Sequence, residues 1–223
     1  MTSNVETKGI RVFVIDDHPM LIEGIRGVIE REEDMAFCGG ATTAAEGLRE
    51  VFRIQPSVCI VELHLPDGNG IDLIAEIRSH LPETRVLVFS MYEDRVFAER
   101  SLRAGANGYL EKTQASGRLV EAVRQVHAGG MYLSRDTANA LLSRLMPAAC
   151  FETPSVESLS EREFQIFERL GLGLTNPEIA DQCCLSVRTV ETYYSRIKDK
   201  LQLANTARMR QFAIEWSKQN CAA

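Results

Sequence analysis

The sequence lacks any long apolar segment, any internal repeat and any cysteine pattern typical of metal binding. No uninterrupted apolar run approaches the roughly 18 residues that a membrane-spanning helix requires. The N-terminal MTSNVETKG has no apolar core of a secretory signal, so we expect a cytoplasmic protein without a membrane partner. Six cysteines are present, without a CxxC pair or a histidine at zinc spacing. We interpret them as reduced thiols that mostly fill apolar sites, with a redox or metal role as the alternative.

The length and the distribution of charge indicate two domains. A chain of 223 residues can form one large domain or two small ones, each with its own core. The part from Leu159 onward has nine Lys and Arg against eight Asp and Glu, whereas the part before it has 16 against 23. An acidic part joined to a near-neutral part favours two domains with different partners. We predict domains over residues 9–128 and 159–219, joined over residues 129–158 by a linker with a short helix from Arg135 to about Met146.

Short apolar runs alternate with amphipathic stretches from Ile10 to about Ala128. The runs read as strands in IRVFVIDD, MAFCGGA, SVCIVE, TRVLVFS and NGYLEK. Almost wholly apolar strands indicate a parallel sheet that is covered on both faces. With right-handed crossovers, this pattern predicts an α/β flavodoxin-like, doubly wound sheet of five parallel strands.

Polar residues follow the predicted strands at the edge where their carboxyl ends meet. Three carboxylates at that edge repel one another unless a cation lies among them, and Mg²⁺ is the usual ion for oxygen ligands. We therefore predict Asp16, Asp17 and Glu62 as metal ligands. With the hydroxyl of Ser90 and the ammonium of Lys112, the set could also hold a phosphoryl group.

Other interpretations of these residues remain open. Asp16 and Asp17 could simply cap the helix that follows them, and His18 and His64 read as solvated loop residues. A Mg²⁺-dependent phosphohydrolase is the enzymatic alternative. The chain lacks a DxDx nucleophile pair at the end of one strand, so we do not expect an enzyme.

From LSEREFQIFERL onward the sequence is helical, with breaks at GLGLTNP, CCLS and LANT. We predict an all-α domain of four helices that contains a helix–turn–helix. Ser186 is the expected cap of VRTVETYYSRIKDKL. The residues of that helix expected to face the core are Val187, Val190, Tyr194, Ile197 and Leu201.

The opposite face of this helix is small, polar and basic, which suits the major groove of double-stranded DNA. A solvated helix face is the alternative. The predicted DNA-binding residues are Arg188, Thr189, Glu191, Thr192, Ser195, Arg196, Lys198 and Lys200. In the last helix, Met209, Phe212 and Trp216 form an apolar stripe that is partly core and a candidate for dimer contacts.

The motifs identify the family that the chain resembles. VIDDHP, VELHLPDGNG, VFSMYED and GYLEK resemble the receiver domain of two-component response regulators, and LSERE, GLTNPEIA and LSVRTVET resemble the LuxR-type DNA-binding domain. The whole chain is similar to a NarL/FixJ-type response regulator. The resemblance implies a transcription regulator that binds DNA as a homodimer and receives input from a histidine kinase or another regulatory protein. It also implies that Ser90 is a switch hydroxyl, Tyr109 a switching aromatic residue and Lys112 a phosphoryl contact.

Glu62 departs from the family, which has a phosphate-accepting aspartate at this position. The additional methylene moves the carboxylate about 1.5 Å outward, toward the space of the phosphoryl group. There it could bond Ser90 or pair with Lys112 and partly imitate phosphorylation. Three hypotheses follow: a natural receiver without ordinary phosphorylation, a deliberate Asp→Glu substitution that imitates activation, and a glutamate that still accepts phosphate. The alternative function is an interaction module whose DNA-binding domain is occluded.

Overall fold

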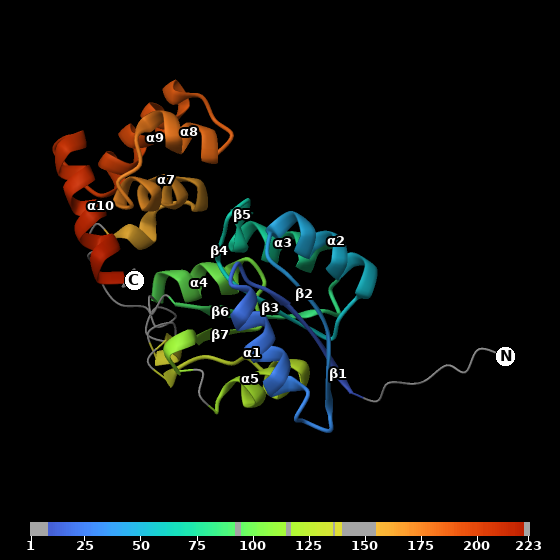
Figure 1. Cartoon of the computed structure of the whole chain (residues 1–223). Helices are drawn as coiled ribbons and strands as arrows, with labels where there is room; N and C mark the ends of the chain where they lie inside the picture. Colours follow the sequence, from blue (N-terminus) through green and yellow to red (C-terminus); the bar gives the residue numbers. More distant parts are fainter. Residues whose placement is uncertain (1–8, 92–94, 115–116, 136, 140–154, 221–223) are drawn as a thin grey trace. The chain divides into compact units, whose positions relative to one another are not determined.

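The computed structural model describes residues 9–91, 95–114, 117–135, 137–139 and 155–220 (Figure 1). These residues fall into two compact units. The first unit contains the elements from β1 to α5, with α4 from Phe97 onward, and the second contains those from η2 to α10. Among the described helices, none combines the length and the apolar character that crossing a bilayer requires.

A parallel sheet forms the centre of the first unit (Figure 1). Its strands pair in the order β2-β1-β3-β6-β7, and every pairing is parallel. The central strand β3 is buried along its whole length, which requires cover on both faces. The order confirms the predicted flavodoxin-like fold. The five strands are β1 (Ile10–Ile15), β2 (Met35–Ala41), β3 (Val58–Val61), β6 (Arg85–Ser90) and β7 (Gly108–Glu111).

Helices cover both faces of this sheet. α1 and α5 pack on one face, where their apolar residues join those of alternate strand positions such as Val12 and Ile60 in one cluster. α2 and α3 lie on the opposite face (Figure 1). The helices described in this unit are α1 (Pro19–Ile29), α2 (Ala44–Ile54), α3 (Gly70–His80), α4 (Arg95–Arg103) and α5 (Leu119–His127), with a 3-10 turn, η1 (Lys112–Gln114).

A short antiparallel pair, β4 (His64–Leu65) and β5 (Gly68–Asn69), follows β3. His64 was predicted as a solvated loop residue, but it lies in β4 and is half-buried. The N–H of Gly70 donates to the carbonyl of Leu63 at 2.7 Å, and a side chain at Gly70 would collide with the backbone of Glu62 and Leu63. Asn69 accepts the N–H of Ile71 and caps α3. These contacts fix the backbone that carries Glu62.

Residues 131–134, here called the edge strap, lie along the outer edge of β7. Tyr132 forms a parallel bridge with Gly108. Its N–H donates to the carbonyl of Asn107 at 3.1 Å, and its carbonyl accepts the N–H of Tyr109 at 2.8 Å. These bonds satisfy backbone groups that an edge strand would otherwise leave open. Sequence patterns do not predict this pairing, because a single bridge has no periodicity.

Gly108→Val is expected to destabilise the first unit by about 2 kcal/mol through overpacking. A Cβ atom at Gly108 would lie 2.9 Å from the carbonyl oxygen of Tyr132 and 3.0 Å from its Cβ atom. We expect faster amide exchange at Tyr109 and Tyr132, measured by hydrogen–deuterium exchange. The control is Gly24→Ala in α1, where nothing lies within 4 Å of the new Cβ atom. Unchanged exchange at both tyrosines would contradict the close packing of the edge strap.

The described part of the second unit is helical. It contains η2 (Val156–Ser158), α7 (Glu161–Gly171), α8 (Asn176–Gln182), α9 (Val187–Lys200) and α10 (Thr206–Asn220). Local capping explains where the helices begin, since Ser160 and Glu163 form a reciprocal capping box at α7. Ser186 caps α9 by accepting the N–H of Thr189 at 3.1 Å. The arrangement confirms the predicted helix–turn–helix, formed by α8 and α9.

The core of the second unit contains most of the stripe predicted on α9. Val190, Tyr194, Ile197 and Leu201 are buried. The prediction for Val187 is wrong, since it is 39% exposed. Val187 is the first residue of α9, and the buried stripe starts at Val190, one turn later.

Two predictions fall partly on residues that the structure does not describe. The linker helix is seen at residues 135 and 137–139, and the rest of its predicted span lies outside the described residues. Cys150 and Cys221 also lie outside them. The cysteines in the described part are free thiols. Burial raises the pKa of Cys59, as expected for an apolar filler, whereas Cys184 is exposed and does not fill an apolar site.

Candidate functional site

The acidic pocket lies at the edge of the sheet where the carboxyl ends of the strands meet. Parallel pairing brings together residues that are far apart in the chain, because β1, β3, β6 and β7 all end at this edge. All of its members except Asp17 have nearly buried side chains. The acidic pocket consists of Asp16, Asp17, Glu62, Ser90 and Lys112.

Both carboxylate oxygens of Glu62 have partners. Oε1 accepts the Ser90 hydroxyl and the N–H of Leu63, each at 2.6 Å, and the N–H of His64 at 3.3 Å. Oε2 lies 2.7 Å from Lys112 Nζ. Glu62 is only 5% exposed, and these donors replace the water that its charge would otherwise need.

Lys112 connects two buried carboxylates. Its Nζ lies 2.6 Å from Asp16 Oδ2 as well as 2.7 Å from Glu62 Oε2. Burial disfavours the charge on Lys112, but Glu62 and Asp16 outweigh burial and raise its pKa above the ordinary value. Nζ also lies 5.9 Å from the centre of the Phe89 ring. The charged form of Lys112 therefore holds the ends of β1 and β3 to the end of β7.

The two aspartates of the acidic pocket both contact the ring of a histidine, and not the carboxylate of Glu62. His18 Nδ1 lies 2.8 Å from Asp17 Oδ1 and 3.3 Å from Asp16 Oδ1. These three residues make up the potential metal-ligating group found in the described part of the chain, and Glu62 is not among them. The carboxylate of Glu62 instead contacts Ser90 and Lys112, and the metal set of Asp16, Asp17 and Glu62 stays a prediction. His18 is 69% exposed, in agreement with the prediction of a solvated loop residue, but its contact with both aspartates was not predicted.

The two expected switch residues are both buried in the first unit. Ser90 has no exposed surface, and Tyr109 is 4% exposed. Ser90 ends β6 and donates its hydroxyl to Glu62, while Tyr109 lies on the neighbouring strand β7, paired with Val88. The backbone N–H of Tyr109 is bonded to the edge strap. One chain of contacts thus runs from Glu62 through Ser90 and β6 to Tyr109.

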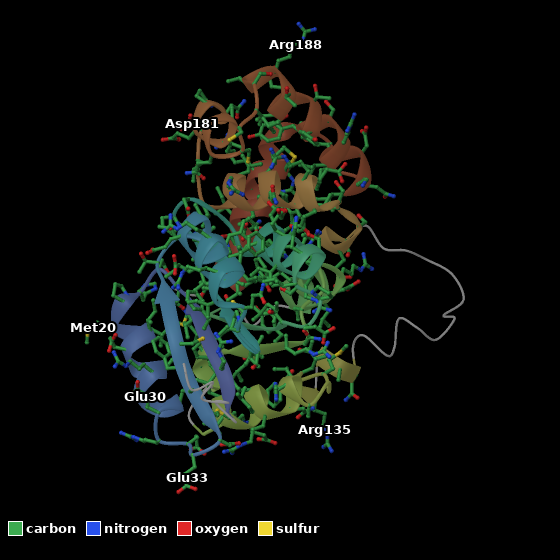
Figure 2. The ribbon with its side chains drawn as sticks, turned by 90° about the vertical axis from the view of Figure 1, so that its right-hand side faces the viewer. Met20, Glu30, Glu33, Arg135, Asp181 and Arg188 are labelled. Carbon is green, nitrogen blue, oxygen red and sulfur yellow. The ribbon has the colours of Figure 1, made fainter. Side chains whose placement is uncertain are left out.

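The predicted DNA-binding surface is an exposed face of α9. Arg188, Glu191, Thr192, Ser195 and Arg196 are exposed, and Thr189 is half-buried. Figure 2 shows Arg188 extending outward from its unit. The Arg196 guanidinium lies 5.6 Å from the centre of the Tyr193 ring, which limits its freedom. This face therefore presents two arginines together with short hydroxyl side chains.

The two lysines of α9 lie in different surroundings from the two arginines. Lys200 Nζ lies 2.7 Å from Glu163 Oε2 of α7 and 3.3 Å from the carbonyl of Ser158. Because this contact occupies the ammonium within its own unit, a phosphate contact by Lys200 would require the pair to open. Lys198 is half-buried, at the edge of the exposed face.

The Lys200–Glu163 pair is expected to make the second unit sensitive to acid. Burial opposes ionisation of Glu163, but hydrogen bonds from Lys200 and Ser160 outweigh it and lower its pKa. A lowered pKa contributes stability that is present above the unfolded value, about 4.3, and is lost as the pH falls through the folded value. Lys200→Ala should therefore reduce the stability of this unit at neutral pH and flatten its decline below about pH 4.3.

Trp216 provides a selective measurement of this effect. It is the only tryptophan in the chain, and its ring lies 5.5 Å from that of Phe164 and 5.8 Å from that of Phe167. Its fluorescence in urea therefore reports unfolding of the second unit. Lys218→Ala, at an exposed position of α10, is the control. Parallel pH profiles for wild type and Lys200→Ala would contradict the assigned pair.

The residues of the apolar stripe on α10 pack mainly into the core of the second unit. Met209 has no exposed surface, which removes it from the candidate dimer contacts. Phe212 and Trp216 are half-buried, and each packs its ring against Phe167. Only the outer parts of these two rings remain available to a second copy.

Comparison with known protein families divides the chain into two parts, as the structure does. Residues 12–124 match the response regulator receiver domain family, and residues 157–213 match the bacterial regulatory proteins of the luxR family. The DNA-binding transcriptional activator DevR/DosR of Mycobacterium tuberculosis is 32% identical over 206 residues, which are 92% of this chain and 94% of that protein. The transcriptional activator protein ExaE of Pseudomonas putida is 32% identical over 212 residues, 92% of this chain and 95% of that protein.

Solved structures with the same fold include RcsB from Salmonella enterica serovar Typhimurium, bound to a promoter in the presence of phosphomimetic BeF3−. The TM-score is 0.71 at 22% identity, with 92% of this chain and 98% of that chain covered. At this identity the likeness shows the fold alone. A LuxR-family two-component response regulator from Aurantimonas sp. is 32% identical with a TM-score of 0.58, over 62% of this chain and 99% of that chain.

Proposed function

The chain belongs to the two-component response regulators of the LuxR family, and we propose that Glu62 holds its receiver in an active-like arrangement without phosphorylation. The observation that carries the proposal is the engagement of Glu62 by both Ser90 and Lys112, at 2.6 and 2.7 Å. In the family, the equivalents of these two groups are expected to hold the phosphoryl group. Here the Ser90 hydroxyl and the Lys112 ammonium contact the carboxylate of Glu62 instead.

The Glu62 carboxylate is a partial substitute for a phosphoryl group. It supplies one negative charge and two oxygens, whereas a phosphorylated side chain has nearly two charges and three acceptor oxygens. It nevertheless accepts the Ser90 hydroxyl, and Tyr109 on the strand next to that of Ser90 is buried. We propose that these two positions bias the receiver toward its active form.

The output of this arrangement is DNA binding by α9. We propose that Arg188 and Arg196 contact phosphates and that Glu191, Thr192 and Ser195 reach base edges. The part from Leu159 onward has nearly balanced charge, with nine Lys and Arg against eight Asp and Glu, so one copy would neutralise few phosphates and bind DNA weakly. A homodimer on a paired site is therefore part of the proposal. An interaction module with an occluded DNA-binding domain is not favoured, since the two relatives described above are named transcriptional activators.

Receivers of this family typically use Mg²⁺ in their acidic pocket, and the residues present fit that ion only in part. Asp16 and Asp17 offer carboxylate oxygens, but Glu62 is bonded to Ser90 and Lys112. A divalent ion would supply positive charge beside an incoming phosphoryl group. We place the protein in the cytoplasm, where it would meet DNA, and we assign it no enzymatic activity of its own. Input from a histidine kinase remains the alternative if Glu62 accepts phosphate.

DNA binding without a phosphodonor is the test of this proposal. Duplexes selected from a random pool by the wild-type chain provide the ligand, and fluorescence anisotropy measures affinity at fixed salt. We expect wild type to bind equally with and without acetyl phosphate, and Glu62→Gln to bind more weakly. Arg188→Ala should weaken binding to all selected duplexes alike and reduce the slope of log affinity against log salt by about 1, as expected for one lost phosphate contact, whereas Lys200→Ala should change affinity little.

Two results would overturn the proposal. The first is wild-type binding that requires acetyl phosphate, which would mean that Glu62 does not replace phosphorylation. The second is an affinity of Glu62→Gln equal to that of wild type, which would separate the Glu62 contacts from DNA binding. Equal losses for Arg188→Ala and Lys200→Ala would instead contradict the assigned DNA-binding face of α9.

A further inference from the structure

Two consecutive residues of α9, Glu191 and Thr192, offer different chemical groups to the edge of a base. Both side chains are exposed, and they share one face of the helix with Arg188 and Ser195, which lie three or four positions away. The proposed function brings this face to the major groove. The groups that the two side chains do not use within the protein therefore determine which bases this face accepts.

Glu191 can only accept hydrogen bonds from a base. In the described part of the chain, no hydrogen bond or ion pair engages its carboxylate, and a carboxylate has no proton to donate. In the major groove guanine presents two acceptors, and thymine presents an acceptor and a methyl group, so neither pairs with a carboxylate. Cytosine presents the N4 amino group, which donates to Glu. Adenine fits less well, because its N7 acceptor lies beside its amino group.

Thr192 has already used its hydroxyl proton within the helix. Its Oγ1 donates to the carbonyl of Arg188 at 3.0 Å, so the side chain offers a base no donor as long as this bond holds. The same bond fixes the side-chain rotamer before DNA is present. The exposed apolar group of Thr192 is its γ-methyl, and a threonine methyl suits contact with the C5-methyl group of thymine.

We propose that Glu191 and Thr192 set the sequence preference of α9, with Glu191 selecting cytosine and Thr192 contacting the methyl group of a thymine. The inference rests on the proposed function, since it requires α9 in the major groove. Ser195 adds little selectivity, because a hydroxyl can both donate and accept. The charge of Glu191 also opposes binding wherever its carboxylate finds no donor, so it discriminates partly by weakening the wrong complexes.

Selection of duplexes from a random pool by the full chain, followed by fluorescence anisotropy on single-base variants, tests the role of Glu191. We expect wild type to enrich cytosine at one position of the site. Changing that base pair should lower wild-type affinity about tenfold, as is typical for one mismatched pair. Glu191→Gln should enrich adenine at the same position, because a carboxamide both donates to N7 and accepts from N6.

Replacement of single thymines by uracil tests the role of Thr192, because it removes only the C5-methyl group. One such replacement should weaken wild-type binding about fourfold, the value of one buried carbon group. The same replacement should leave the affinity of Thr192→Ser unchanged, since serine keeps the hydroxyl that bonds to Arg188 but lacks the γ-methyl.

Glu215→Gln is the matched control, because it removes the same charge from an exposed position of α10. It should select the same sequence as wild type. A preference for cytosine that persists in Glu191→Gln would overturn the role of Glu191, and equal effects of uracil on wild type and Thr192→Ser would overturn that of Thr192. Both results would leave the proposed function standing, since DNA would still be bound. A wild-type chain that enriches no duplex would overturn the inference and the proposed function together.

Discussion

Glu62→Asp is expected to raise the rate of phosphoryl uptake from acetyl phosphate by about 10²-fold. In the wild type the Glu62 carboxylate occupies the space beside Ser90 and Lys112, 2.6 and 2.7 Å from their donor atoms. An aspartate would end about 1.5 Å earlier. Ser90 and Lys112 could then hold the phosphoryl group while the shorter carboxylate attacks phosphorus and acetate leaves. The expected factor is that of a reacting group displaced by about 1 Å.

Intact-mass spectrometry over time, with Mg²⁺ or Mn²⁺ present, measures this rate. Glu62→Gln is the control, because it keeps the length of the side chain and removes the nucleophilic oxygen. We expect one phosphoryl adduct on Glu62→Asp and none on Glu62→Gln. Labelling of the wild type as fast as Glu62→Asp would show that Glu62 is a working acceptor and would support the hypothesis of a phosphorylated glutamate.

Glu62→Asp also separates two possible roles of residue 62, namely filling the acidic pocket and accepting a phosphoryl group. In unlabelled Glu62→Asp the shorter carboxylate no longer accepts the Ser90 hydroxyl. This variant should therefore bind DNA more weakly than wild type before acetyl phosphate is added. Labelling should then restore binding. If unlabelled Glu62→Asp binds as tightly as wild type, the contact between Ser90 and Glu62 does not control the output.

Much of the architecture follows from pattern alone. The run SVCIVE contains the wholly buried strand β3, and the capping residue Ser186 marks the start of α9. Such features repeat along the chain and are therefore visible in sequence. The edge strap and the β4–β5 pair are different, because each depends on one or two backbone contacts. Gly108 and Gly70 enable these contacts through close approach, which no periodicity reports.

The site was predictable as a set of residues, and so were the contacts of Glu62 with Ser90 and Lys112 as possibilities, but the other partnerships were not. The ends of β1, β3, β6 and β7 had to meet once the sheet was inferred, which brings Asp16, Glu62, Ser90 and Lys112 together. Which oxygen bonds which donor depends on side-chain length and rotamer, and sequence patterns report neither. For that reason the contact of His18 with Asp16 and Asp17 was not predicted. Similarly, the pairing of Lys200 with Glu163 on α7 depends on tertiary packing.

Lys112→Met is expected to destabilise the first unit by about 3–5 kcal/mol, because it leaves two buried carboxylates without their shared cation. Asp16 and Glu62 are 2% and 5% exposed, so water can replace the ammonium only in part. The Met side chain keeps the apolar stem of the lysine, which confines the change to the charge. The cost is much larger than that of an exposed pair such as Arg26–Glu30 on α1.

Hydrogen–deuterium exchange of the buried amides in β3 and β6 measures this loss within the first unit. Arg26→Met is the control and should leave the exchange unchanged, since the Arg26 side chain is 48% exposed. Adding Glu62→Gln to Lys112→Met should recover part of the stability, because it removes one of the two unpaired charges. A double-mutant cycle over these variants gives the coupling between Lys112 and Glu62, expected at about 1–3 kcal/mol. A coupling near zero would mean that Asp16 alone holds the ammonium, and that Glu62 owes its position to Ser90 and the backbone N–H groups after β3.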